Sequence, residues 1–208
     1  MKKILCALLA LTLMPCTFAM AETIVPQFTE LDTTDATYPA AFSRNDLKDG
    51  TLNNVRLYTE DWYDIVDVEQ MKVGDTFEAE GNTITVETIE KNQFGDIDIN
   101  GGFEAENGYT LTTEEDTNGW TTTGYDDFCT YTQRDTVSLA LAENITFNDS
   151  YFLDVEAIEA GREALTASGI EAVTKAIMES ESDSFNELNT KITFKDGKVV
   201  EITRRYIP

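Results

Sequence analysis

Histidine is missing from all 208 residues of this chain. Its absence excludes the Ser-His-Asp triad, the Cys-His pair and His-ligated zinc, because each of these needs an imidazole. Catalysis would have to use carboxylates, lysine, tyrosine or a serine system without histidine. The chain has 39 Asp and Glu residues, but a catalytic carboxylate pair is defined by its separation in space, and no sequence spacing singles one out. We therefore expect that the protein is not an enzyme.

Long apolar runs are also missing, apart from a short one at the N-terminus. Lys2 and Lys3 precede an apolar segment at residues 4–14, and Ala19 and Ala21 are the small residues that a signal peptidase site needs. We expect residues 1–21 to be a cleavable signal peptide. The apolar segment is much shorter than the roughly 20 residues that span a bilayer. The sequence thus predicts an exported protein, secreted or periplasmic, without membrane insertion.

Cysteine is scarce. Cys6 and Cys16 lie in the leader, and only Cys129 follows it. Cys16 lacks the small preceding residue of a lipid-acceptor cysteine, so we expect no acylation. A single cysteine cannot form an internal disulfide, and a chain of this length buries about 70% of the surface that its unfolded form exposes. The fold must therefore be held together by its hydrophobic core.

Basic residues are few. Without Lys2 and Lys3, the chain has 13 Lys and Arg against 39 Asp and Glu, a formal charge of −26. This charge repels nucleic acids and anionic lipid surfaces, whereas it favours cations and basic partners. It also keeps an exported protein dispersed, which is by itself a sufficient reason for it. We expect no nucleic-acid partner but a protein or a glycan of unknown identity; the sequence predicts no particular oligomeric state.

Apolar residues after position 50 recur with a period of two, which is typical of half-buried strands. We predict strands at residues 52–58 and 63–68, and a hairpin that joins residues 76–80 to residues 83–89 across a Gly-Asn turn. Further short strands, separated by turns, continue to residue 147. This pattern predicts a mainly β (α+β) fold, either an antiparallel sandwich or a partly open barrel.

Helical periodicity occurs only after residue 150. Ile170, Val173 and Ile177 form an apolar stripe, and Ser168 with Glu171 matches a capping box. We expect a helical pair, inserted at about residues 154–181, before a C-terminal β-hairpin.

Strands flank the predicted helices on both sides. We therefore expect residues 22–208 to form a single β-rich domain. Its polar, turn-rich N-terminal arm, residues 22–50, is expected to dock on the core through Tyr38 and Phe42.

One acidic segment begins like a calcium-binding loop. Asp96, Asp98 and Asn100 stand at positions 1, 3 and 5, and Gly101 at position 6. Position 12 is asparagine instead of glutamate, and the flanking segments alternate like strands. We favour the structural interpretation, in which the intervening isoleucines point into the core and Asn100 and Gly101 form a turn. We expect no cofactor, with calcium at Asp96, Asp98 and Asn100 as the minority hypothesis.

Four aromatic residues are candidates for ligand binding. Trp62, Tyr63, Trp120 and Tyr125 stand near acidic or amide residues, and glycan-binding sandwiches combine exposed aromatic rings with such hydrogen-bonding neighbours. Aromatic residues in a core have the same sequence pattern, because Tyr and Trp are often buried with only their polar tips in water.

Several strand and turn segments together resemble uncharacterised exported proteins of intestinal bacteria. The resemblance spans most of the chain after the leader, and it implies export from a bacterial cell but no activity, ligand or catalytic residue. The segments are residues 63–68, 72–76, 99–102, 108–111 and 196–202.

These observations favour an exported, non-catalytic bacterial binding or structural module that recognises a protein or a glycan at or outside the cell envelope. Two alternatives stay open. One is a carboxylate-based hydrolase of envelope polysaccharide, which needs two carboxylates about 5 to 9.5 Å apart in one cleft. The other is a calcium-stabilised adhesin-like module, whose unfolding midpoint would rise when calcium binds.

Overall fold

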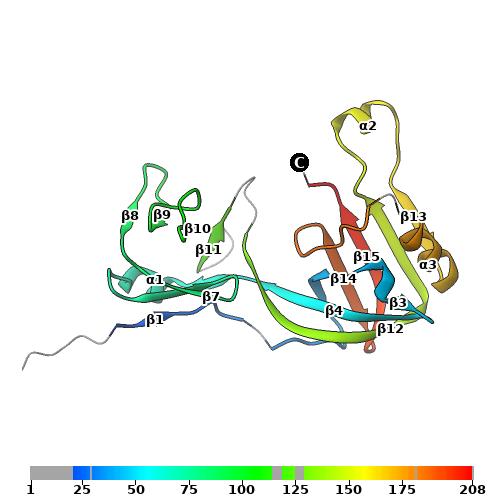
Figure 1. Cartoon of the computed structure of the whole chain (residues 1–208), viewed down its shortest axis with the longest axis horizontal. Coiled ribbons are helices and arrows are strands. Elements are labelled where there is room, and N and C mark those ends of the chain that lie inside the picture. The colour runs from blue at the N-terminus through cyan, green and yellow to red at the C-terminus, as the bar shows by residue number, and fades with distance from the viewer. Residues whose placement is uncertain (1–20, 29, 114–118, 125–128, 181, 208) are drawn as a thin grey trace, which may run out of the picture.

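The computed structural model describes residues 21–28, 30–113, 119–124, 129–180 and 182–207. It is mainly β, as the sequence predicts, and has two lobes joined by a narrow neck (Figure 1). Each lobe has its own cluster of buried apolar residues. Within the described residues, no helix has the length and apolar character needed to cross a bilayer.

The first lobe, which we call the barrel lobe, is built from residues 37–60 and from the chain after residue 130. It contains β2 (Thr37–Ala41), η1 (Arg44–Asp46), β3 (Leu47–Lys48), β4 (Thr51–Glu60), β12 (Tyr131–Ser150), α2 (Val155–Glu159), β13 (Leu165–Ser168), α3 (Ile170–Met178), β14 (Thr190–Lys195) and β15 (Lys198–Arg205).

The second lobe, which we call the insertion lobe, lies between β4 and β12 in the sequence and adds one N-terminal strand. It contains β1 (Thr23–Ile24), β5 (Trp62–Asp64), α1 (Ile65–Gln70), β6 (Thr76–Ala79), β7 (Asn82–Thr85), β8 (Ile89–Lys91), β9 (Ile97–Ile99), β10 (Tyr109–Thr113) and β11 (Gly119–Thr123).

The sheet of the barrel lobe closes on itself through β12. The first half of this 20-residue strand pairs antiparallel with β4, and its second half pairs in parallel with β15. Since β4, β2, β14 and β15 are also hydrogen-bonded neighbours in that order, the five strands form a closed circuit. Register shifts along β12 mark the bulges that allow one strand to bend from one side of the circuit to the other.

Alternating apolar residues fill the inside of this circuit. On the C-terminal hairpin, Ile192 faces Ile202 and Phe194 faces Val199, as the sequence predicts, and all four are buried. The apolar stripe of α3 packs on the same core through Val173 and Ile177. Phe42 is buried in it and Tyr38 packs against it, which is the docking expected of residues 22–50.

The insertion lobe packs a three-stranded sheet against a five-stranded one. The first sheet has the order β1-β6-β7, in which β1 is parallel to β6, and the second has the order β5-β11-β10-β9-β8. Helix α1 and the turn that follows it close one side of the core through Val68 and Met71. The largest side chains between the sheets are those of Tyr63, Phe77, Ile99, Leu111 and Trp120.

The predicted strand at residues 63–68 is wrong after residue 64. Ile65–Gln70 is helix α1, because the Asp64 side chain caps it by accepting the backbone N–H of Val66 at 2.8 Å. The predicted helical pair is present, but β13 lies between α2 and α3. Ser168 ends that strand, and the N-cap of α3 is Gly169, which makes no side-chain capping bond, so the predicted capping box is wrong too.

One fully buried arginine connects β15 to the end of β12 and to the loop after α3 in the barrel lobe. Arg204 donates from Nε to Asp149 Oδ1 at 3.0 Å and from Nη2 to Asp149 Oδ2 at 2.5 Å. Its remaining N–H groups bond Ser180 Oγ and the carbonyls of Ser182 and Ser184. The guanidinium also lies 4.2 Å from the ring centre of Phe185. Each donor is thus satisfied, which is the condition for burying this charge.

We expect Arg204→Met to destabilise the protein by about 3 to 5 kcal/mol, because Asp149 would stay buried without a counter-charge. The double variant Arg204→Met/Asp149→Leu should recover most of that loss. The matched control, Arg56→Met, changes an exposed residue of β4 and should cost less than about 0.5 kcal/mol. Urea unfolding of the four proteins measures these differences, and equal losses for Arg204→Met and Arg56→Met would contradict the assignment.

Candidate ligand cleft between the two lobes

Three segments of the chain form the neck between the lobes: the end of β4, the start of β12 and the segment after β1. The two long strands pair antiparallel up to Tyr131 and Glu60. Beside them, the backbone N–H of Gln27 donates to the carbonyl of Trp62 at 2.6 Å. Phe28 lies under the guanidinium of Arg134, 4.2 Å from its ring centre. The N-terminal segment therefore braces the neck alongside the paired strands.

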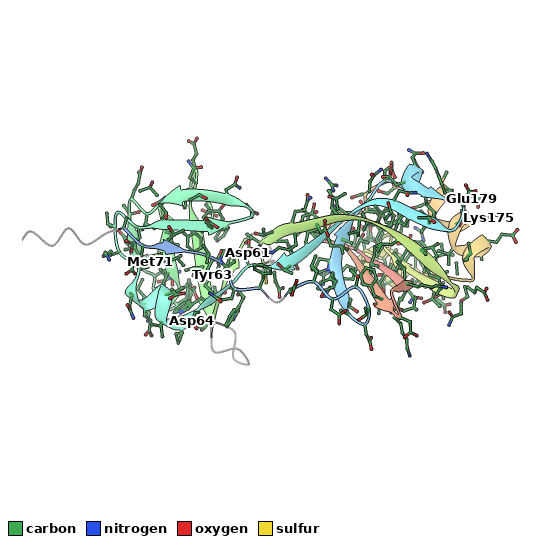
Figure 2. All side chains as sticks on the ribbon, turned by 90° about the horizontal axis from the view of Figure 1, so that it is seen from below. Asp61, Tyr63, Asp64, Met71, Lys175 and Glu179 are labelled. Carbon is green, nitrogen blue, oxygen red and sulfur yellow. The ribbon has the colours of Figure 1, made fainter. Side chains whose placement is uncertain are left out.

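A buried carboxylate ties these segments together. Asp61, between β4 and β5, is fully buried, and Figure 2 shows it where the insertion lobe meets the long strands. Its Oδ2 accepts the backbone N–H of Glu80 and the hydroxyl of Thr130, both at 2.8 Å, and its Oδ1 accepts the hydroxyl of Thr132 at 2.5 Å. These donors come from the β6–β7 turn and from the start of β12.

A cleft of about 500 Å³ lies directly beside this junction. Glu80, Phe103, Tyr109 and Thr130 line one wall, while Leu188 and Ile207 belong to the barrel lobe and line the other. In Figure 1, the C-terminal end and the loop before β14 lie on the side of the barrel lobe that faces β11. The cleft is thus made by both lobes, and neither lobe alone forms it.

The cleft is acidic. Burial raises the pKa of the Glu80 carboxyl, and the negative charges of Asp61 and Glu187 raise it further. Burial and the charge of Glu80 likewise raise the pKa of Tyr109, whose hydroxyl lies 3.5 Å from Glu80 Oε2. Next to the cleft, burial and the charge of Glu60 raise the pKa of Tyr131 to about 12. A cationic group bound here would relieve this accumulation of negative charge.

Two of the aromatic residues that the sequence suggests as a ligand platform, Tyr63 and Trp120, are paired neighbours on β5 and β11 and are buried in one core. Tyr63 is fully buried and donates from its hydroxyl to the Glu78 carbonyl at 2.8 Å, and Trp120 is 6% exposed. Both belong to the core of the insertion lobe. Trp62 is half-buried, and its indole packs over Gly119, where an added Cβ would come within 2.2 Å of it. Tyr125 lies outside the described residues. Tyr63 and Trp120 therefore fill the core and do not form an exposed surface.

The residues of the calcium hypothesis are engaged in local hydrogen bonds. Asp96 accepts from the Asn92 amide at 3.2 Å, and Asp98 accepts from the Thr110 hydroxyl at 2.7 Å. Asn100 uses its side-chain oxygen for the backbone N–H of Glu87 at 2.8 Å. In the parts of the chain that the structure describes, no group of three or more Asp, Glu or Cys residues is placed to hold a metal ion. Asn100, with a φ of 52°, fits the turn expected at this position.

Sequence reasoning missed the residues that line the cleft. In the sequence, Glu80 stands out only as part of a Glu-Gly-Asn turn. Leu188 and Ile207 follow no pattern that marks them as binding residues. These residues are distant in sequence and meet only because the insertion lobe sits beside the barrel. Asp61 offered a weak signal, since a carboxylate within an otherwise alternating apolar strand pattern must find donors if it is buried.

No protein-family model, no curated protein and no solved structure matches this chain. Its function must therefore be inferred from the geometry of the cleft.

We expect Asp61→Ala to destabilise the protein by about 2 to 4 kcal/mol, because three donors lose a buried acceptor. Asp67→Ala is the control, since Asp67 is exposed on α1 and should change stability by no more than about 0.5 kcal/mol. Denaturant unfolding compares the two. If Asp61→Ala were as mild as the control, the neck would not depend on this carboxylate.

Glu80 should make stability depend on pH. A carboxyl whose pKa is raised by folding holds its proton more tightly in the native state, so its contribution is present below the unfolded pKa and is lost as the pH rises through the folded value. We expect Glu80→Gln to raise the thermal midpoint at pH 7 slightly, because the free energy of unfolding rises by less than about 1 kcal/mol for a partly exposed carboxyl. Near pH 4 the midpoint should be unchanged. Glu69→Gln, at an exposed position on α1, should show no such difference. A lower midpoint for Glu80→Gln at pH 7 would contradict the assigned shift.

Proposed function

We propose that this protein is an exported, non-catalytic binding module that takes a segment of a partner protein, carrying a basic side chain, into the cleft between its two lobes. The observation that carries the proposal is Glu80, a carboxylate with a raised pKa that lies beside Tyr109 in a cleft of about 500 Å³. Export is supported by the leader-like residues 1–21.

The lining of the cleft supports a ligand that is partly apolar. Phe103, Tyr109, Leu188 and Ile207 supply apolar and aromatic surface, and Glu80 supplies a charge at one side. Ligand sites commonly combine a mostly apolar cavity with a few polar groups that fix the orientation. An Arg or Lys side chain has the matching construction, because its aliphatic stem packs on apolar surface and its charged end reaches a carboxylate.

Charge favours a basic protein over a neutral glycan. The formal charge of −26 after the leader attracts a positively charged partner at long range, and Glu80, Glu187 and Asp61 concentrate negative charge at the cleft. The aromatic residues first considered for glycan binding do not support that alternative as a pair, because Trp120 and Tyr63 are core residues.

One observation also favours the hydrolase alternative: a carboxyl with a raised pKa has the property of a general acid. A glycosidase would need a second carboxylate in the same cleft. Asp61 is the carboxylate that most raises the pKa of Glu80, but its oxygens accept three hydrogen bonds and are buried. Binding is therefore the better-supported function.

Binding should be tested with a panel of short peptides that place one Arg or Lys between apolar residues, alongside a glycan array. We expect peptide binding that weakens as salt is added, and that falls roughly tenfold in Glu80→Gln, a loss of about 1.4 kcal/mol. Isothermal titration measures the affinities, and Glu69→Gln, on the exposed face of α1, is the matched control.

Two results would overturn this proposal. Peptide binding that is equal in Glu80→Gln and Glu69→Gln would remove the cleft as the site. Binding to glycans alone, unaffected by Glu80→Gln, would support the glycan alternative instead.

A further inference from the structure

A buried carboxylate, Asp75, contacts the backbone nitrogen of Glu22. Asp75 lies in the turn before β6, and its side chain is only 1% exposed. Its Oδ1 accepts the backbone N–H of Glu22 at 3.0 Å. Glu22 is the first residue after the expected cleavage site at Ala21, and both residues are exposed. The nitrogen that faces Asp75 is therefore the one that processing would convert from an amide into an α-amino group.

The neighbouring strand holds this nitrogen in place. Thr23 and Ile24 form β1 and pair in parallel with Thr76 and Phe77 of β6. The backbone N–H of Thr76 donates to the Glu22 carbonyl at 2.9 Å, and the hydroxyls of Thr76 and Thr23 are 2.8 Å apart. Ile24 is buried in the core of the insertion lobe. The position of Glu22 N against Asp75 is thus set by β pairing and by core packing.

Asp75 has few other charged neighbours. The ammonium of Lys72 is 3.8 Å from Oδ1 but half exposed, and the backbone N–H of Lys72 donates to Oδ2 at 3.0 Å. Burial by itself would raise the pKa of Asp75, but the backbone N–H groups of Glu22 and Lys72, together with the Lys72 charge, outweigh it and lower the pKa. Asp75 is therefore a shielded carboxylate that favours a cation beside Oδ1.

We infer that Asp75 is a binding site for the chain's own processed N-terminus: cleavage after Ala21 places the α-ammonium group of Glu22 against Asp75 Oδ1 and locks β1 onto β6. In the precursor this position offers one neutral N–H donor. In the processed chain it offers a full positive charge and three N–H donors, and charge-assisted hydrogen bonds are roughly twice as strong as neutral ones. The inference rests on the export part of the proposed function and is independent of what binds in the cleft.

The sign of the pH dependence follows from the cation. A carboxylate partner favours the protonated amine, so the added stability is present below the pKa of a free N-terminus, about 7.7 to 8.0, and is lost as the pH rises past the folded value. Asp75 stays charged throughout this range, because its own pKa is lowered.

The test compares two purified chains, each released from a fusion partner without extra residues. One begins at Glu22, and the other retains Ala21, which moves the charge one residue away. We expect the chain that begins at Glu22 to unfold at a midpoint roughly 2 to 4 °C higher at pH 6.5, with the difference shrinking above about pH 9 as the amine loses its proton. Equal midpoints at pH 6.5 would overturn the inference.

Asp75→Asn in both chains should abolish this difference, whereas Asp67→Asn, the exposed control on α1, should preserve it. A difference that persists in Asp75→Asn would assign the effect to something other than this pair. Should Asp75→Asn not fold, the chain beginning at Glu22 can be made with an N-terminal acetyl group, and its midpoint should fall to that of the chain that retains Ala21. An acetylated chain that keeps the higher midpoint would contradict the inference.

Neither experiment needs a cleft ligand. Mass spectrometry of the exported protein tests the expected N-terminus at Glu22 separately, and cleavage at another residue would remove the physiological role. A failed peptide titration would leave this inference standing, so the two proposals fail by different results.

Discussion

The arrangement of the two lobes depends on the burial of one carboxylate. Asp61 has no contact with solvent, and a charge in that position is tolerable only if hydrogen-bond donors replace the lost water. The donors are Glu80 N–H, Thr130 and Thr132, and they belong to the β6–β7 turn and to the start of β12. Satisfying Asp61 therefore fixes the β6–β7 turn against the start of β12. The same contact positions Glu80 at the cleft, so the neck and the candidate site share one constraint.

The chain has few basic residues, and this affects both its interior contacts and the charge of its surface. Arg204 is fully buried in the barrel lobe, and Arg134 lies over Phe28 at the neck. Both cations are therefore engaged in contacts with other residues of the fold. With so few basic residues left to balance 39 acidic ones, the surface is strongly negative, and a cleft lined by Glu80 lies within that field. Long-range attraction as well as local contact would therefore favour the basic partner that we propose.

Local patterns predicted much of the fold, and non-local contacts decided the rest. Alternation identified β4, the β6–β7 hairpin and the β14–β15 hairpin, because each buries one face. It failed at residues 65–70, where β-branched residues resemble a strand but the Asp64 cap selects a helix. The candidate aromatic platform rested on residue type, and residue type does not distinguish Trp120 in a core from a tryptophan on a surface, so the core alternative stayed open. The cleft had no local signal, because Glu80 and Ile207 are distant in sequence and meet only where the insertion lobe lies beside the barrel lobe.

The way the lobes are joined argues for a preformed cleft. The first half of β12 pairs with β4 up to the neck, so a hinge within this pairing would have to break ladder hydrogen bonds. The bridge between Gln27 and Trp62 adds a third connection on another side, and β1 anchors that segment in the insertion lobe. Two strands alone permit twisting, whereas a third attachment resists it. The residues that line the cleft would therefore be in position before a ligand binds. The affinity of the ligand would then not be reduced by the entropic cost of ordering the cleft.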